Sequence, residues 1–205
     1  MPKIVDITTK RAELVAASLD VIANDGLAGA TLRRIAAHLG ASTGSITHYF
    51  DGRDALLVEA VRTAHEAAGV RMTRALGLLD DPASRLEAVI LEALPLDSHR
   101  IREWRVWSAF RGALPGNSLL SAGNELGYGA WRTLLVALLA PFFADAEDVR
   151  RESGLIMALV DGIGFRLAAL PRRSLQLAAE QQQAADDIRG YLKRVVDLQT
   201  RGPVA

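Results

Sequence analysis

The stretch LRRIAAHLGASTGSITHYF, residues 32–50, decides the fold of this chain. Its first apolar side chains recur at the i, i+3, i+4 and i+7 spacing of one helix face, and they are Leu32, Ile35, Ala36 and Leu39. Thr31 stands where an N-cap belongs, and Gly40 can adopt the left-handed conformation that ends a helix. The first half of the stretch therefore predicts a short, capped helix.

A second helix is predicted directly after this glycine. The hydroxyl of Ser42 can cap it, and its apolar stripe consists of Ile46, Tyr49 and Phe50. Because Ala36 is small, the two helices can cross closely and leave the outer face of the second one free. The spacing is that of a helix-turn-helix.

The outer face of the second helix carries small or hydrogen-bonding side chains and no acidic group. Such a face fits the major groove of DNA. Its members are Thr43, Gly44, Ser45, Thr47 and His48. The alternative is a surface helical hairpin whose outer face is polar without binding DNA.

The distribution of charge favours a sequence-specific DNA binder. Lys plus Arg and Asp plus Glu each number 24, so a zero net charge offers nucleic acid no general attraction. Within residues 31–50 the only formal charges are Arg33 and Arg34, while Lys10 and Arg11 begin the preceding helix. We expect Lys10 to point at a DNA phosphate.

Composition limits the other classes of protein. The 205 residues are 50% apolar and include no cysteine, which excludes a disulfide framework and thiolate metal sites and agrees with a reducing cytosol. The first residues lack the apolar core of a signal peptide, and the longest apolar run, residues 134–143, is half a membrane span and contains a proline. We expect a cytoplasmic protein without a membrane role.

Catalytic chemistry has little support in the sequence. The four histidines show no metal-ligand spacing, and neither a nucleophile motif nor a glycine-rich phosphate loop is present. We therefore expect no enzyme activity, no metal and no cofactor. A helical adaptor that binds another protein is the remaining rival, but the acid-free face of residues 43–48 would have no purpose there.

The remaining pattern predicts only helices, because no segment alternates with period two. We expect a supporting helix from Thr8 or Thr9 to about Gly26, then helices over residues 53–79, 82–95, 98–114, 118–139, 147–170 and 180–198. The fold class is all-α with about nine helices. Residues 1–52 are expected to form a three-helix DNA-binding domain, and residues 53–205 a larger effector-binding and dimerisation domain.

The helix that begins at Arg53 lies beside the predicted DNA-binding hairpin. Its first N–H groups and the guanidinium of Arg53 can hold a phosphate, and its far end can respond to events in the second domain. The alternative for Arg53 is a solvated surface charge.

The helix over residues 154–170 is apolar on most sides and contains three glycines, which let another helix come close. With the last helix it can form a four-helix bundle across a two-fold axis. The expected dimer contacts are Leu155, Leu159, Gly162, Ile163, Arg166, Ile188, Leu192 and Val195. The alternative is a buried core helix of a monomer.

Aromatic residues gather on two consecutive predicted helices. Such a cluster can line an effector pocket that attracts organic cations or flat apolar molecules. The candidate residues are Trp104, Trp107, Phe110, Arg111, Tyr128, Trp131 and Asp161. Two alternatives stay open: the aromatic residues belong to the core or a dimer interface, and Asp161 is paired across an interface or exposed.

Residues 31–57, TLRRIAAHLGASTGSITHYFDGRDALL, resemble the TetR family of bacterial transcriptional repressors. The WSAF near Trp107 and the VDGIGFRLAAL near Asp161 resemble the BetI branch, whose best-known member answers to choline. The resemblance implies a homodimer that a small-molecule effector releases from a palindromic operator in double-stranded DNA.

The resemblance also implies roles for individual residues. Thr43, Gly44, Ser45 and His48 would face bases or sugar-phosphate, Tyr49 and Arg53 would hold phosphates, and Arg33 would lie along the adjacent backbone. We include the caps Thr31 and Ser42 in the expected DNA interface. Two residues depart from the family pattern, since Thr47 replaces a tyrosine and Arg53 replaces a lysine.

Overall fold

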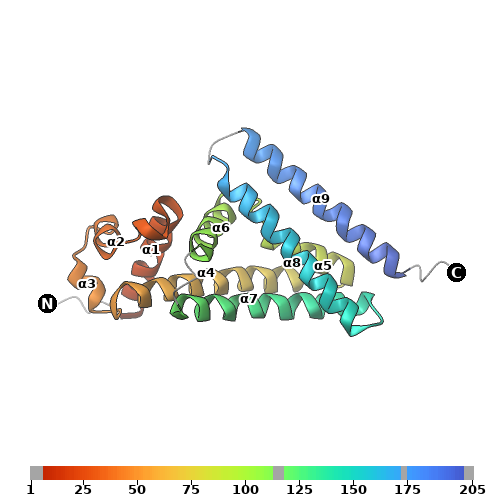
Figure 1. Cartoon of the computed structure of the whole chain (residues 1–205), viewed down its shortest axis with the longest axis horizontal. Helices are drawn as coiled ribbons and strands as arrows, with labels where there is room; N and C mark the ends of the chain where they lie inside the picture. The colour runs from red at the N-terminus through yellow and green to blue at the C-terminus, as the bar shows by residue number, and fades with distance from the viewer. Residues whose placement is uncertain (1–6, 113–117, 172–174, 201–205) are drawn as a thin grey trace. The chain divides into compact units, whose positions relative to one another are not determined.

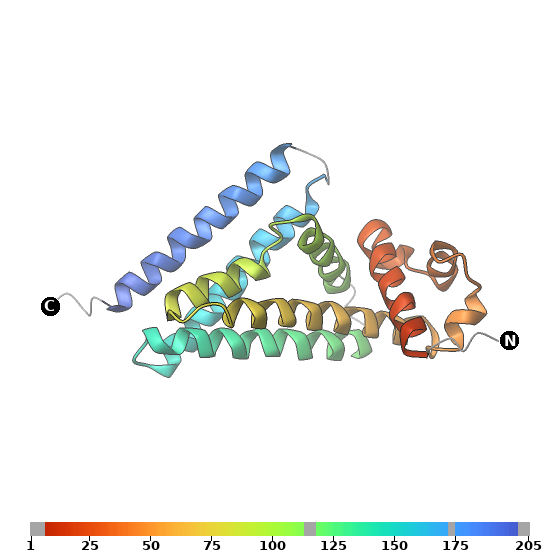
Figure 2. The ribbon, with the colours of Figure 1, turned by 180° about the vertical axis from the view of Figure 1, so that it is seen from behind.

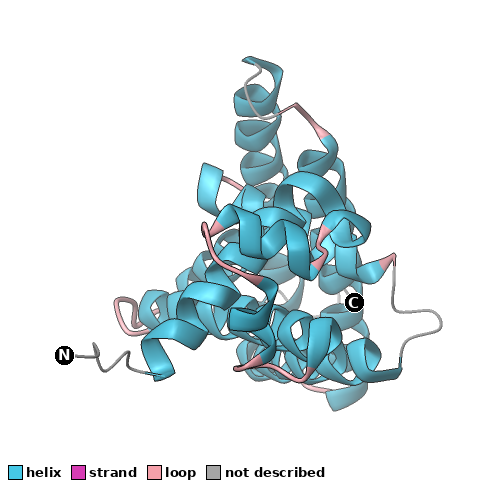
Figure 3. Ribbon diagram, turned by 90° about the vertical axis from the view of Figure 1, so that its left-hand side faces the viewer, coloured by secondary structure: helices cyan, strands magenta, loops and turns pink. Residues whose placement is uncertain are grey.

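The computed structural model describes residues 7–112, 118–171 and 175–200. Over these residues the backbone forms nine α-helices, a short 3-10 turn and no strand (Figures 1 and 3). The elements are α1 Ile7–Gly29, α2 Leu32–His38, α3 Thr43–Thr47, α4 Gly52–Leu76, α5 Pro82–Ala93, α6 Ser98–Arg111, α7 Ser118–Leu139, η1 Ala140–Phe142, α8 Ala146–Ala169 and α9 Leu175–Thr200. The predicted all-α fold is confirmed.

The helix ends lie close to the predicted ones, with four differences. α3 ends at Thr47, so Tyr49 and Phe50 lie after this helix and not on its predicted apolar stripe. α1 extends to Gly29, although the sequence predicts its end near Gly26. Gly26 itself is non-helical, with a φ of 71° and a ψ of 176°, so a kink falls at the predicted end. α4 ends at Leu76, three residues early, because Gly77 is a poor helix former. α9 begins at Leu175, before the predicted Glu180. The predicted end of α6 at Leu114 lies outside the described residues.

The chain divides into two compact units. Unit 1 is residues 1–66 with 102–127, and unit 2 is residues 67–101 with 128–205. Helices α4, α6 and α7 therefore each contribute residues to both units. A packing unit is not the same as a functional domain, so the boundary between the two domains at residue 52 remains a prediction.

Unit 1 is built on one apolar core that five helices share. Its fully buried side chains include Leu14 of α1, Ile35 of α2 and Ile46 of α3. Val106 and Phe110 of α6 belong to the same core. The short helices of the hairpin are therefore held by a core that includes α6.

Unit 2 is built around α5, α8 and α9. The last two helices run antiparallel and contact one another, and α9 also contacts α5 (Figures 1 and 2). Buried side chains of all three helices fill the space between them, among them Ile90, Ile156 and Ile188.

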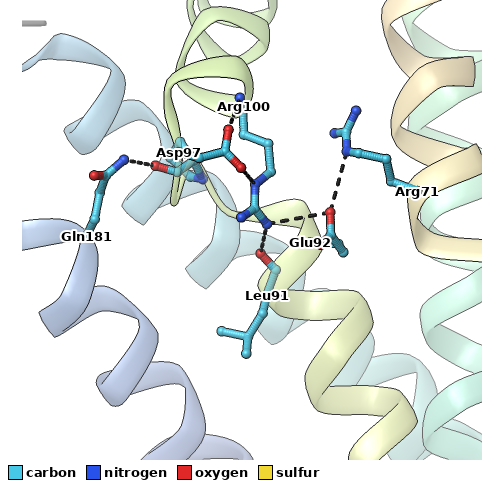
Figure 4. A network of polar contacts seen from close by, with 7 residues as sticks. Arg71, Leu91, Glu92, Asp97, Arg100 and Gln181 are labelled. Atoms are coloured by element: carbon cyan, nitrogen blue, oxygen red, sulfur yellow. Dashed lines mark hydrogen bonds and ion pairs between the residues drawn. The ribbon is translucent and has the colours of Figure 1, made fainter. Parts of the chain in front are cut away.

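A polar network fastens the connection between α5 and α6 in unit 2 (Figure 4). The guanidinium of Arg100 donates to the Leu91 carbonyl at 2.8 Å and to the Asp97 carboxylate at 2.7 Å. Glu92 lies 3.5 Å from Arg100 and 3.4 Å from Arg71 of α4. The start of α6 is therefore tied to both α4 and α5.

Candidate DNA-binding site

The turn and caps of the hairpin have the predicted geometry. The Thr31 hydroxyl accepts a hydrogen bond from the Arg34 N–H at 3.2 Å, and the Ser42 hydroxyl accepts one from the Ser45 N–H at 3.2 Å. Gly40 has a φ of 63°, which a residue with a Cβ rarely adopts. These bonds satisfy N–H groups that the first turn of a helix leaves without partners. The predicted caps and turn are confirmed.

The predicted outer face of α3 is directed to solvent. Ile46 is fully buried and anchors the helix, while Ser45 is half-buried. The remaining members of the face are exposed: Thr43, Gly44, Thr47 and His48. The predicted orientation is therefore confirmed for these four residues, and contact of the whole face with DNA remains a prediction.

Arg11 fixes the end of the hairpin to α1. Its guanidinium donates to the Tyr49 carbonyl oxygen and lies over the Phe50 ring, with Cζ 4.2 Å from the ring centroid. The half-buried Tyr49 ring meets the His48 ring edge to face at 4.8 Å. Sequence reasoning missed this role of Arg11, because no local signal connects residues 38 positions apart.

Several cations of this region already have partners within the chain. Lys10 pairs with Glu13 at 2.7 Å and Arg34 with Asp25 at 2.8 Å, whereas Arg33 is exposed. Surface pairs of this kind contribute about 0 to 1 kcal/mol, so a DNA phosphate can replace such a partner at small cost.

Arg53 has a structural role that the sequence did not indicate. Its guanidinium donates to the carbonyl oxygens of Ala30, at 2.8 Å, and of Leu27. It also lies 3.4 Å from the Asp54 carboxylate. Arg53 therefore joins the first turn of α4 to the last turn of α1 and to Ala30 in the link that follows it. Its contact with a DNA phosphate remains a prediction.

Asp20 of α1 faces two basic side chains from other helices. One carboxylate oxygen accepts a hydrogen bond from the Arg102 guanidinium of α6. The other lies 3.7 Å from Nε2 of His38, the last residue of α2. This contact was not predicted, because the sequence alone does not bring α6 to the hairpin.

The seven residues of the predicted effector pocket are divided between the two units. In unit 1, Trp104 and Phe110 are buried, and the half-buried Trp107 ring lies 5.3 Å from the Trp104 ring. Arg111 is half-buried in the same unit.

In unit 2 the hydroxyl of Tyr128 donates to the Asp161 carboxylate at 2.6 Å, and Trp131 is half-buried on the same helix as Tyr128. Asp161 is therefore paired with a residue of its own chain. An effector site formed by these seven residues remains a prediction.

A close helix contact in unit 1 joins α4 to α7. The His65 ring is packed edge to face on Trp107 at 5.6 Å, and burial lowers the pKa of His65 below its ordinary value. A Cβ placed on Gly127 would lie 1.8 Å from Nδ1 of His65. Gly127 is therefore the residue that lets α7 approach this neutral ring.

Replacing Gly127 by Ala should destabilise unit 1. The added methyl group forces the His65 ring off Trp107, and overpacking of this kind costs about 1 to 3 kcal/mol. Thermal unfolding measures the effect. The matched control is Gly129→Ala in the same helix, where a Cβ meets nothing within 4 Å. That variant should be as stable as the parent or more so, and equal stability of both variants would contradict the prediction.

The predicted dimer contacts fall into two groups. Leu155 is 53% exposed, Gly162 and Arg166 are exposed, and Leu159 is half-buried, all on α8. Arg166 also pairs with Glu180 of α9. The second group is buried within the chain itself and consists of Ile163, Ile188, Leu192 and Val195. Only the first group is open to a partner, and participation of either group in a dimer remains a prediction.

The described residues contain no group of three or more His, Cys, Asp or Glu side chains placed to hold a metal ion. No helix among them is long and apolar enough to span a bilayer.

Comparison with protein families gives two matches that together cover most of the chain. The model of bacterial regulatory proteins of the tetR family matches residues 14–60. The model of the C-terminal region of BetI-type transcriptional repressors matches residues 82–196.

Curated relatives include HTH-type transcriptional regulators. PksA of Bacillus subtilis is 30% identical over 176 residues, which cover 84% of this chain and 85% of PksA. BetI of Burkholderia ambifaria is 31% identical over 186 residues, which cover 87% of this chain and 94% of BetI.

Solved structures share the fold. A transcriptional regulator from Rhodococcus sp. Rha1 superposes with a TM-score of 0.79 at 29% identity, covering 92% of this chain and 98% of that one. A putative transcriptional regulator from Saccharomonospora viridis in complex with choline gives a TM-score of 0.77 at 21% identity, covering 93% and 96%. At that identity the second likeness concerns the fold alone.

Proposed function

Because the chain belongs to the TetR family of bacterial regulatory proteins, with a C-terminal region of the BetI type, we propose that it represses transcription as a homodimer. The dimer binds a palindromic operator and leaves it when a small-molecule effector binds. The observation that carries the proposal is the exposed, acid-free face of α3 above the fully buried Ile46.

In this proposal α3 enters the major groove of the operator. Thr43, Ser45 and His48 offer hydroxyl and imidazole groups to base edges and sugar-phosphate. Gly44 has no side chain and lets the backbone approach, and Arg33 and Tyr49 contact phosphates on either side. With few charges near α3, affinity rests on shape and hydrogen bonds more than on counterion release.

The dimer is proposed to form through the outer faces of α8 and α9. Leu155 and Gly162 lie exposed on α8, and nothing lies within 4 Å of a Cβ built on Gly162. A second helix can therefore approach the backbone closely at this point. A two-fold axis there gives the dimer two hairpins, one from each chain, which matches the two half-sites of a palindrome.

The effector is proposed to be an organic cation or a flat apolar molecule bound near the aromatic residues of α6 and α7. The edge-to-face pair of Trp104 and Trp107 supports an aromatic environment. The choline complex of the Saccharomonospora viridis regulator supports a cationic ligand on the same fold. Release requires that the effector bind the DNA-free state more tightly. We place this regulator in the cytoplasm and assign it no catalytic activity.

The double variant Thr43→Ala and His48→Ala should lose sequence-specific DNA binding. Each lost base contact is worth about 1 to 3 kcal/mol, so operator affinity should fall by about 30-fold or more. Fluorescence anisotropy with DNA from upstream of the protein's own gene measures the dissociation constant over a range of salt concentrations.

The matched control is the double variant Thr73→Ala and His99→Ala, which changes the same residue types at exposed positions of unit 2. It should bind DNA as the parent does. Absence of a sequence-specific complex at any salt concentration would overturn the proposed function, and so would unchanged binding by the first double variant.

A further inference from the structure

Helix α6 contributes side chains to the apolar core on which the hairpin of α2 and α3 is packed. Val106 and Phe110 are 1% and 0% exposed in the same apolar core as Leu14, Ile35 and Ile46. α6 therefore packs with α1, α2 and α3 in one core. Because packed cores deform little, a displacement of α6 must be taken up by the helices that share its core.

Besides the shared core, a polar contact also joins α6 to the hairpin. Asp20 of α1 accepts a hydrogen bond from Arg102 of α6 through one carboxylate oxygen. The second oxygen faces His38 at 3.7 Å. One carboxylate thus connects three helices whose residues lie up to 82 positions apart in the sequence.

His38 lies close to α3 in the sequence, so a change in its contact with Asp20 can affect α3. His38 is the last residue of α2, and only Leu39, the Gly40 turn, Ala41 and the cap Ser42 separate it from α3. A shift of the α2 end therefore alters the direction in which α3 begins. One helical turn earlier in α2, the pair of Arg34 with Asp25 makes a separate contact with α1.

We propose that Asp20 is a positioning residue that couples α6 to the orientation of α3, so that an effector acting on α6 changes the affinity for DNA through this carboxylate. The inference rests on the proposed function, because it names a route by which that function is regulated. The start of α6 is held at Arg100 by Asp97 and Glu92 of unit 2, two residues before Arg102 in the same helix (Figure 4). α6 thus has one arginine fixed in unit 2 and the next fixed on Asp20.

The contact contributes little to stability, which separates positioning from folding. The side chains of Arg102 and Asp20 are 44% and 31% exposed, and pairs this exposed are worth little in folding free energy. If the pair served only the fold, its removal would change almost nothing. If the pair positions α3, its removal leaves the end of α2 free to move. DNA binding must then order the end of α2, which lowers the affinity.

The test compares Arg102→Gln, Asp20→Asn and their combination in the full-length dimer. DNA binding is measured by anisotropy with a fragment selected from random sequence by the parent protein, and stability by thermal unfolding. The control is Arg189→Gln, which removes the similarly exposed pair of Arg189 with Glu87, 3.0 Å apart in unit 2.

Each single variant should bind the selected DNA about 3- to 30-fold more weakly, the size that coupling residues commonly show. The combination should bind no more weakly than the weaker-binding single variant, because both remove the same link. Unfolding midpoints should shift no more than in Arg189→Gln, which should bind DNA as the parent does. Asp20→Glu, which keeps the charge, should bind within about threefold of the parent.

Unchanged affinity in the two single variants would overturn the inference while leaving the proposed function intact. Additive losses in the combination would overturn it too, as would losses that follow a lowered unfolding midpoint. If random selection with the parent protein yields no specific DNA, the proposed function fails and this inference fails with it.

Discussion

Replacing Phe110 by Ala should greatly lower the free energy of unfolding of unit 1. Phe110 is 0% exposed and packs in the core that α6 shares with the hairpin helices. Removing a buried phenyl ring from a packed core costs about 3 to 5 kcal/mol. Urea unfolding at a fixed protein concentration measures the loss, since the stability of the proposed dimer would depend on concentration.

The conservative variant Phe110→Leu fills much of the same volume and should cost less than about 1.5 kcal/mol. The comparison also decides between the two interpretations of this residue. A phenyl ring that only lined an effector pocket would cost little in stability when truncated, so a loss below about 1 kcal/mol for Phe110→Ala would contradict its place in the core.

Replacing Leu155 by Glu should separate the proposed dimer into monomers. Leu155 is 53% exposed on α8 and would lie in the apolar seam of the dimer. The two-fold axis brings two introduced carboxylates into that seam without partners, and an uncompensated buried charge costs about 3 to 5 kcal/mol. Dimerisation should weaken by about 100-fold or more, which light scattering detects as a halved mass.

The affinity of the Leu155→Glu variant for the operator should also fall, because a monomer contacts one half-site only. The control is Leu78→Glu, which places the same charge at a leucine of unit 2 that is 77% exposed. This variant should remain dimeric and bind the operator. If the Leu155→Glu variant remains a dimer, the interface does not include this face of α8.

Local features of the hairpin could be predicted from the sequence because their causes are local. Thr31 and Ser42 cap helices through hydrogen bonds to N–H groups three residues on, and Gly40 adopts a conformation that its own lack of a Cβ permits. The burial of Ile46 and the exposure of His48 follow from their spacing along one helix.

Contacts between distant segments could not be predicted in this way. Arg53 lies at a helix start and suits a phosphate by type, yet its guanidinium donates to the carbonyls of Leu27 and Ala30. The pairing of Asp20 with Arg102 depends on which helices become neighbours, and helical periodicity does not encode that.

The same limit applies to the burial of side chains on α8 and α9. Ile188 and Leu192 share an apolar stripe with period near 3.6, which shows that one face of α9 is covered. The stripe does not say whether the cover is the same chain or a second copy. In the described structure these two side chains are buried within their own chain, whereas Leu155 is not.

The shared core of unit 1 also sets the order in which this protein can fold during synthesis. A nascent chain that has emerged from the ribosome up to Leu57 already holds the hairpin, but it lacks Val106 and Phe110, which close the core from α6. About fifty more residues must be translated before these arrive, which takes several seconds at about 5 to 20 residues per second. During that interval the DNA-binding helices expose the apolar surface that α6 later covers.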